Sequence, residues 1–381
     1  MRWGRAAAVA GAAALGAGAA ALIAGRAVSE FSVRTGGDAP ADAGGLRVHT
    51  AGDGKVELTR SVETLRPGRY ALEWDTPFGP ARTVIGPVLG TTPQSVVRRL
   101  VNPDGSTPSD GSAPPAGTPV RMTPRVYAGD PHSALGLPYN EVEVRGELGP
   151  MPAWHLPGAR GVCVVAVHGI GADREQVLPL LPLFHRLKLP VLAVTLRNDE
   201  GAPPSPDGLA HAGDTEWRDV EAAVQLVLDG TADSVLLYGW STGATTVLQT
   251  FDRSPWRDRV RGIVLDSPVL DWRDTARRQA TRRGVPGSLA ALGVRAAEGR
   301  AGVDTAAIDR IALGAEIDVP LLLLHSPDDT VAPIDPVRRL AANTEEWVLF
   351  REFPWAEHEA LWNADPKGYD EILRRYLTPL L

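Results

Sequence analysis

The stretch SVLLYGWSTGATTVLQTF, residues 234–251, carries the clearest fold signal in this 381-residue chain. It begins with an apolar run typical of a strand buried on both faces and continues as a helix. Between the two lies Gly239-Trp240-Ser241-Thr242-Gly243, which fits the pattern G-x-S-x-G. A tight turn from strand to helix strains the central serine, and the residues two positions away collide unless they are glycine. The pattern therefore predicts that Ser241 lies above the C-terminal edge of a sheet, where a helix N-terminus favours an anion.

Strands and helices alternate along residues 136–381, which predicts an α/β fold with a mostly parallel, doubly wound sheet and helices on both faces. We expect strands at 161–167, 191–196, 234–238, 260–266, 319–325 and 347–353, helices at 173–188, 215–228, 242–251, 335–342 and 365–377, and a hairpin of 141–145 with 152–156.

The alternation lapses over residues 269–317, which we predict to be a helical cap insertion above the sheet edge. This interval contains several arginines: Arg273, Arg277, Arg278, Arg282, Arg283, Arg295 and Arg300. Two interpretations stay open, because such residues either bind a carboxylate or phosphate of a substrate or form a solvated helical face.

A serine hydroxyl is a poor nucleophile unless a base accepts its proton and a third group orients that base. The histidines downstream of Ser241 are His325 and His358. His358 follows the last predicted strand in a loop at the C-terminal edge, so we predict that it is the base. Three carboxylates that follow strand ends are candidates for the third group: Asp329, which we prefer, Asp328 and Asp266. The alternative for Ser241 is a structural turn in which the serine only caps the helix.

The run Val167-His168-Gly169-Ile170-Gly171 follows the predicted strand 161–167. Hydrolysis of an acyl bond needs hydrogen-bond donors for the oxyanion of the tetrahedral intermediate. We predict that the backbone N–H groups of Ile170 and Thr242 supply them, with Gly169 and Gly171 allowing the close turn. His168 is expected to shape the loop and not to act as a second base.

Four segments together resemble one family: HGIG at 168–171, GWSTG at 239–243, HSPDDTVAP at 325–333 and WAEH at 355–358. They resemble the α/β-hydrolase superfamily, and most closely its bacterial serine-aminopeptidase-like (S33-type) group. RNDEGAP at 197–203, SPDG at 205–208, DTEW at 214–217 and GLPY at 136–139 are similar to the same group. The resemblance covers 136–381, and Ser326 and Ala244 stand where glycine is usual.

That resemblance implies an α/β-hydrolase fold with Ser241 as nucleophile, His358 as base and Asp329 as orienting acid. The backbone N–H groups of Ile170 and Thr242 would form the oxyanion hole. The implied reaction is cleavage of an ester or amide bond in a small molecule, through an acyl-enzyme and without a cofactor. Two alternatives stay open: an acyltransferase or cofactor-free haloperoxidase-like activity on the same residues, and a membrane-tethered binding module without catalysis.

Residues 1–35 are predicted to be a signal-anchor segment, because Ala6–Gly25 is uncharged and lies between basic residues. A cleaved signal peptide and an Ala-rich tail are the alternatives. The positive charges before this segment favour a cytoplasmic N-terminus, with the rest of the chain outside the cytoplasm. We then expect a linker at 36–45, a small β-rich accessory region at 46–101, a Pro/Gly/Ser-rich linker at 102–135 and the catalytic domain at 136–381.

The composition narrows the class of partner. The formal net charge of −7 argues against nucleic acid. Cys163 is the single cysteine and lies in an apolar run, so a buried strand residue is favoured over a catalytic thiol. We find no zinc-type motif and predict no metal.

Overall fold

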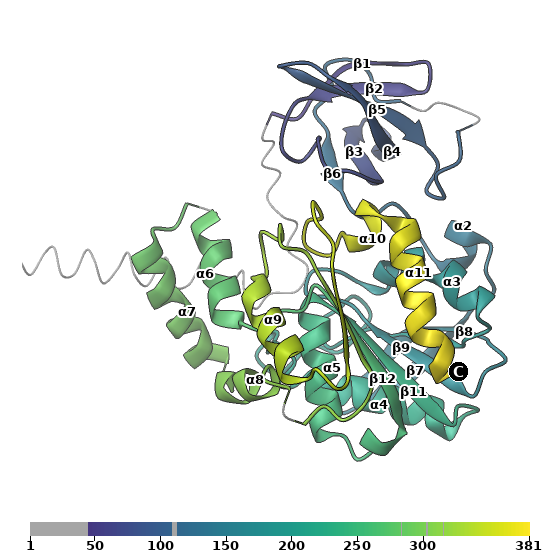
Figure 1. The fold of residues 1–381 in the computed structure, drawn as a ribbon, viewed down its shortest axis with the longest axis vertical. Coiled ribbons are helices and arrows are strands. Elements are labelled where there is room, and N and C mark those ends of the chain that lie inside the picture. The colour runs from purple at the N-terminus through teal and green to yellow at the C-terminus, as the bar shows by residue number, and fades with distance from the viewer. Residues whose placement is uncertain (1–44, 109–112, 283, 302–303, 315) are drawn as a thin grey trace, which may run out of the picture.

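The computed structural model describes residues 45–108, 113–282, 284–301, 304–314 and 316–381. They form two sheets, with the N-terminal one lying beyond helix α10 (Leu361–Ala364) of the larger, C-terminal part (Figure 1). The predicted anchor at 1–35 and linker at 36–45 lie outside these residues, apart from Gly45. Among the described helices, none combines the length and the apolar character that crossing a bilayer requires.

The N-terminal sheet is antiparallel, in the order β1-β2-β5-β4-β3-β6. Strand β2 alternates buried and accessible positions, and the buried side chains of this sheet, such as Leu58 and Leu72, form a separate small core. The last strand falls inside the segment predicted to be a linker, where it pairs with β3. The strands are β1 Val48–Gly52, β2 Lys55–Thr59, β3 Tyr70–Thr76, β4 Gly79–Thr91, β5 Ser95–Val101 and β6 Arg121–Thr123.

The C-terminal sheet has the order β14-β13-β12-β11-β9-β10-β8-β7. Strands β9 to β14 run parallel, whereas β8 is antiparallel to its neighbours β10 and β7. Every side chain of the central β9 and β11 is buried, which explains their uninterrupted apolar runs. The strands are β7 Asn140–Gly146, β8 Gly149–Leu156, β9 Val162–Val167, β10 Val191–Ala193, β11 Ser234–Trp240, β12 Val260–Asp266, β13 Leu321–His325 and β14 Val348–Glu352.

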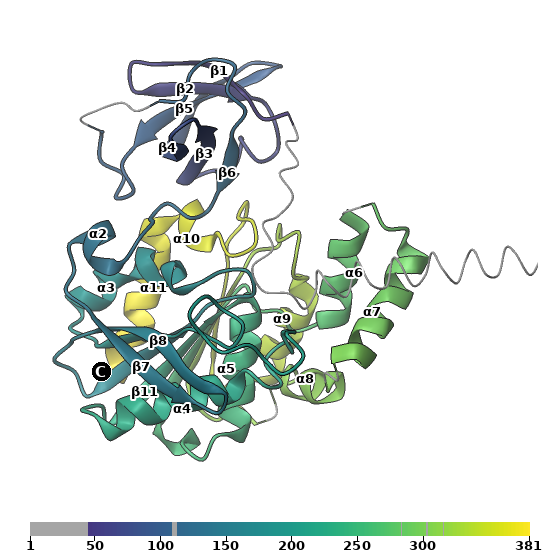
Figure 2. The same cartoon turned by 180° about the vertical axis from the view of Figure 1, so that it is seen from behind.

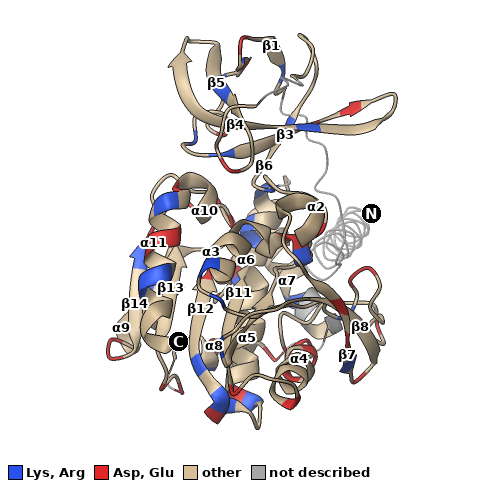
Figure 3. Cartoon of the chain, turned by 90° about the vertical axis from the view of Figure 1, so that its right-hand side faces the viewer, with Lys and Arg blue, Asp and Glu red and all other residues tan. Residues whose placement is uncertain are grey.

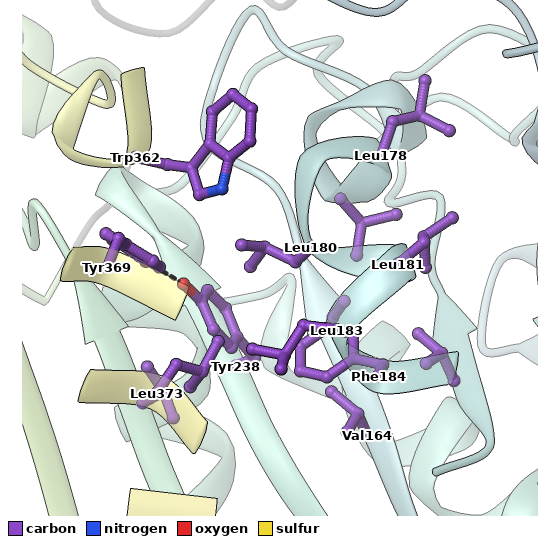
Figure 4. Close-up of a cluster of buried hydrophobic side chains, with 14 of the residues drawn as sticks. Val164, Leu178, Leu180, Leu181, Leu183, Phe184, Tyr238, Trp362, Tyr369 and Leu373 are labelled. Carbon is purple, nitrogen blue, oxygen red and sulfur yellow. Dashed lines mark hydrogen bonds between the residues drawn. The ribbon is translucent and has the colours of Figure 1, made fainter. Parts of the chain in front are cut away.

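Helices cover both faces of this sheet, as the alternation predicts. On one face, Val164 packs in a cluster with side chains of α3 and α11, where Tyr238 and Tyr369 meet (Figure 4). On the other face, Val165 packs with α4, α5 and α9. The helical segments are α2 Pro131–Leu135, η1 Arg174–Leu180, α3 Leu181–Arg186, α4 Trp217–Asp229, α5 Ser241–Arg253, η2 Arg257–Arg259, α9 Ile334–Asn343, α10 Leu361–Ala364, α11 Pro366–Leu377 and η3 Thr378–Leu380.

Two predicted elements differ from the structure. The helix expected at 173–188 is a 3₁₀ segment followed by a short α-helix, because Pro179 and Pro182 lack the backbone N–H that a continuous helix needs. The strand expected at 191–196 ends at Ala193, where the chain leaves the sheet towards the loop of Asp199.

The predicted insertion is helical and consists of α6 Trp272–Arg282, α7 Gly287–Ala301 and α8 Thr305–Ile311. Helices α6 and α7 extend on the side of the molecule opposite α2 and α3 (Figure 2). Arg273 pairs with Asp309 of the same insertion at 3.0 Å, and Arg277 and Arg278 both pair with Asp274. These contacts favour the solvated helical face over a substrate-binding role for those three arginines.

Candidate active site

Strand β11 runs directly into helix α5 at Ser241, whose backbone has φ of 51°. A side chain on either flanking glycine would clash: a Cβ on Gly239 would lie 2.6 Å from Ala244 Cα, and one on Gly243 would lie 2.3 Å from the His168 carbonyl oxygen. The turn therefore holds the serine in the strained geometry for which G-x-S-x-G is suited.

Three residues far apart in the sequence meet at this turn. Ser241 Oγ lies 2.8 Å from His358 Nε2, and His358 Nδ1 lies 2.7 Å from Asp329 Oδ2. Asp329 follows β13 and His358 follows β14, so both reach the serine from the C-terminal edge of the sheet. The hydroxyl, the imidazole and the carboxylate form one continuous chain of hydrogen bonds.

The Asp329 carboxylate is fixed from its other side. Its Oδ1 accepts hydrogen bonds from the N–H groups of Val331 and Ala332, at 2.7 and 2.8 Å. Burial alone would raise the pKa of Asp329, but the charge and hydrogen bond of His358 lower it below its ordinary value. The group facing His358 is therefore an ionised carboxylate with a defined orientation.

The rival acids have other partners. Asp328 Oδ2 accepts the Trp355 N–H at 2.6 Å. Asp266 accepts hydrogen bonds from Tyr369 Oη at 2.5 Å and Ser267 Oγ at 2.8 Å, and its burial raises the pKa to about 7. Neither carboxylate has a hydrogen bond to His358 among those found in the described residues.

The loop after β9 lies beside Ser241. The Ile170 N–H donates to Thr242 Oγ1 at 2.8 Å, so the predicted oxyanion donor already has a partner. Gly171 has φ of 76°, a conformation that favours glycine. His168 is buried and bonds to Asp199 at 2.9 Å, a contact that fits its predicted role in shaping the loop.

Comparison with known proteins gives the family. A family model described as Alpha/beta hydrolase family matches residues 164–379. The chain belongs to this family. A second model, for a domain of unknown function (DUF8805), matches residues 47–114. Among curated proteins, none matches this chain.

Several solved structures are similar to this α/β hydrolase. An esterase from Pyrococcus furiosus is 20% identical, with a TM-score of 0.55, and the match covers 66% of this chain and 94% of the esterase. A second crystal form of that esterase is 19% identical, with a TM-score of 0.54, and covers 67% and 98%. A proline iminopeptidase-related protein from Thermus thermophilus is 17% identical, with a TM-score of 0.48, and covers 64% and 100%.

Acidic groups surround the histidine of this hydrolase. Burial alone would lower the pKa of His358, but the charge and hydrogen bond of Asp329, together with Glu359 and Glu357, raise it to about 9. The sequence analysis missed both glutamates as parts of the site. The available signal was their position, because they flank His358 directly.

Glu359 has a further feature. Its Oε1 is buried and has no hydrogen-bond partner. A Cβ placed on Gly169 would lie 2.2 Å from this oxygen and 2.9 Å from Ser241 Cβ, so the carboxyl group lies beside Ser241. A substrate at Ser241 would therefore come close to an oxygen that lacks a donor.

Two cavities adjoin the site. One of about 30 Å³ is lined by Ile170, Thr242 and Trp272 of α6, among others. The other, of about 60 Å³, is lined by residues 124–127, Trp240 and Glu359, among others. Thr242 and Trp240 flank Ser241 in the chain, so the two cavities lie on either side of the turn.

The described residues also bear on metal, thiol and nucleic-acid sites. No group of three or more His, Cys, Asp or Glu residues there is arranged to hold a metal ion. Burial raises the pKa of the Cys163 thiol to about 12, which keeps it protonated and inert. Basic and acidic residues of the C-terminal part are interspersed and form no basic stripe in the view of Figure 3.

Proposed function

We propose that this α/β hydrolase is a serine hydrolase that cleaves an ester or amide bond through an acyl-enzyme. Ser241 is the nucleophile, His358 the general base and Asp329 the group that orients it. One observation carries the proposal: the unbroken contacts from Ser241 Oγ to His358 at 2.8 Å and from His358 to Asp329 at 2.7 Å.

The proposed reaction begins when Ser241 Oγ attacks the carbonyl carbon of the substrate. With Nδ1–H directed at Asp329, His358 Nε2 has a free lone pair and takes the serine proton. The intermediate then collapses, and the leaving alcohol or amine takes that proton from His358. Water next attacks the acyl carbon while His358 removes its proton. The second intermediate then collapses as His358 gives that proton to Ser241 Oγ, which releases the acid and restores the serine.

The oxyanion of each tetrahedral intermediate needs donors, and the Ile170 and Thr242 N–H groups are the proposed ones. The Ile170 N–H must exchange its present acceptor, Thr242 Oγ1, for the substrate oxygen. Rotation of one side chain is sufficient for this exchange, because the acceptor is a hydroxyl and not part of the backbone.

A fluorophosphonate probe tests the assignment, because it reacts covalently with an activated serine. The wild-type chain should be labelled, and Ser241→Ala should remove the label. A wild-type chain that stays unlabelled would favour the non-catalytic binding module instead. Labelling without net hydrolysis, but with transfer to an added alcohol or amine, would favour the acyltransferase.

A serine aminopeptidase-like activity is a second candidate, and the unpartnered Glu359 Oε1 beside Ser241 favours it. An α-ammonium group on the substrate would supply the missing donor and offset the negative charge near the oxyanion. Paired p-nitroanilides with free and N-acetylated amino groups test this. The free amine should be preferred in the wild type, and Glu359→Gln should reduce that preference.

The N-terminal segment is proposed to hold the enzyme at a membrane, with the catalytic domain outside the cytoplasm. Its support is the uncharged stretch Ala6–Gly25 between basic residues. The full chain should stay with membranes through an alkaline wash, and release into the wash would contradict an anchor.

A further inference from the structure

The N-terminal sheet contacts the catalytic domain next to His358. The loop of residues 60–69, which joins β2 to β3 and is called the docking loop here, meets helix α10. The Arg69 N–H donates to the Asn363 carbonyl at 2.9 Å, and Asn363 Nδ2 donates back to the Arg69 carbonyl at 2.8 Å. A Cβ on Gly68 would lie 1.8 Å from the Asn363 oxygen, so this contact requires glycine.

The docking loop also reaches the residue that precedes the catalytic histidine. Arg66 forms an ion pair with Glu357 Oε2. Glu357 Oε1 accepts hydrogen bonds from the Thr330 N–H at 3.0 Å and the Thr330 hydroxyl at 2.5 Å. Because Thr330 follows Asp329, Glu357 joins the loop of the base to the loop of the acid, and Arg66 holds Glu357 from outside.

The docking loop itself is fixed by a buried cation. The Arg98 side chain is fully buried and donates to four backbone carbonyls, three of which belong to the docking loop. The acceptors are Gly86 at 2.7 Å, Thr64 at 3.1 Å, Arg66 at 2.8 Å and Gly68 at 2.8 Å. Arg66 is therefore presented by a loop whose backbone is held within its own domain.

We propose that the N-terminal β domain is a positioning element of the active site, and that Arg66 is the positioning residue through which it acts. The Arg66–Glu357 pair sets the separation of His358 from Asp329 and Ser241. This inference rests on the proposed function, since it concerns the proton transfer that His358 performs. It assigns a role to the region that matches the domain of unknown function.

The charge of Arg66 should affect the pH dependence of kcat/KM. Among the described residues, the titratable groups that interact with His358 include Asp329, Glu357, Glu359, Asp266 and His325. Arg66 offsets the charge of Glu357. Without Arg66, Glu357 stabilises protonated His358 more strongly, so the acid limb of kcat/KM moves to higher pH. Replacement of Glu357 by glutamine moves the limb in the opposite direction.

The test uses the full chain with Arg66→Met and, as a matched control, Arg60→Met. Arg60 lies in the same loop but its side chain donates only to the Thr92 carbonyl of its own domain among the described residues. We expect Arg66→Met to lower kcat about tenfold with little change in KM, since a small misplacement of a catalytic group lowers the rate steeply. Arg66→Lys should restore part of kcat, and Arg60→Met should match the wild type.

Glu357→Gln provides the second arm and keeps the test valid if Arg66→Met unfolds at the assay temperature. The proposal predicts opposite shifts of the acid limb for the two variants and a double variant whose loss in kcat is less than the product of the single losses. Equal kcat for Arg66→Met and Arg60→Met, or unshifted limbs, would overturn it. Failure of the proposed function is separate, because Ser241→Ala would then keep its activity.

Discussion

The two sheets of this protein contrast in how they are built and in what they contribute. The catalytic sheet is mostly parallel, and its central strands are buried on both faces by two layers of helices. The N-terminal sheet is antiparallel, has a small core and contains the buried Arg98. The contrast teaches that a large apolar sheet can hold a strained serine turn at its edge, whereas a small sheet with polar loops can contact a loop of the neighbouring domain.

The strongest test of this contrast is Ser241→Ala. We expect kcat to fall by roughly 10⁶-fold, because in serine hydrolases the nucleophile acts as a unit with its base. The melting temperature should change little, since the substitution removes one oxygen from a strained position. Steady-state kinetics with p-nitrophenyl esters, alongside thermal unfolding, measures both. Retained activity would mean that the reaction does not use Ser241 at this edge of the sheet.

Asp329→Asn should lower kcat by about 10⁴-fold, because an amide neither stabilises the imidazolium nor holds the tautomer. Asp329 raises the pKa of His358, so its loss should lower that pKa. The acid limb of any residual activity should therefore lie at lower pH than in the wild type. Asp328→Asn is the matched control. Asparagine can still accept the Trp355 N–H, so its kcat should stay within about threefold of the wild type. If Asp328→Asn lowered kcat more than Asp329→Asn, Asp328 and not Asp329 would be the acid that orients the histidine.

The wild-type pH profile should rise as His358 loses its proton. With its pKa raised to about 9, protonated His358 predominates at neutral pH, and this form cannot accept the Ser241 proton. We expect half-maximal kcat/KM at a pH above the ordinary value for histidine, about 6.5. A bell-shaped profile with its acid limb below that value would contradict the acidic surroundings described for His358.

Leu237→Ala tests how much the core of the larger sheet contributes to stability. Leu237 is fully buried in β11, so the free energy of unfolding of the catalytic domain should fall by about 2–5 kcal/mol. Leu226 of α4 is partly exposed, and Leu226→Ala should change stability far less. Chemical denaturation measures both variants. Equal effects would mean that the apolar runs do not form the dominant core.

Arg98→Met tests the N-terminal sheet in the same way. It leaves buried carbonyls without a donor and should destabilise the N-terminal domain by roughly 2–3 kcal/mol. Because Arg98 fixes the docking loop, kcat should also fall, by a smaller factor than in Arg66→Met. Hydrogen exchange of residues 60–69 checks the loosening directly. An unchanged exchange rate there would mean that Arg98 does not hold the docking loop in place.

The order of elements could be predicted because each depends on local pattern. The predicted strand at 260–266 coincides with β12, and the hydrolase fold is confirmed by the family match. The helix expected at 173–188 was wrong in kind, since its prolines leave only short helical turns. Residue β-propensity did not reveal β6, because three residues after a Pro- and Gly-rich stretch carry too little signal.

The sequence by itself determined the fold class and the turn at Ser241. Burial on both faces demands apolar strands, and the turn demands glycine at 239 and 243, so both requirements are visible locally. Only the tertiary structure decided which aspartate faces His358, that Thr242 Oγ1 engages the Ile170 N–H, and that Arg66 meets Glu357 across 291 residues of chain. Such contacts depend on how separate loops dock, and docking depends on the whole fold and leaves no periodic mark in either loop.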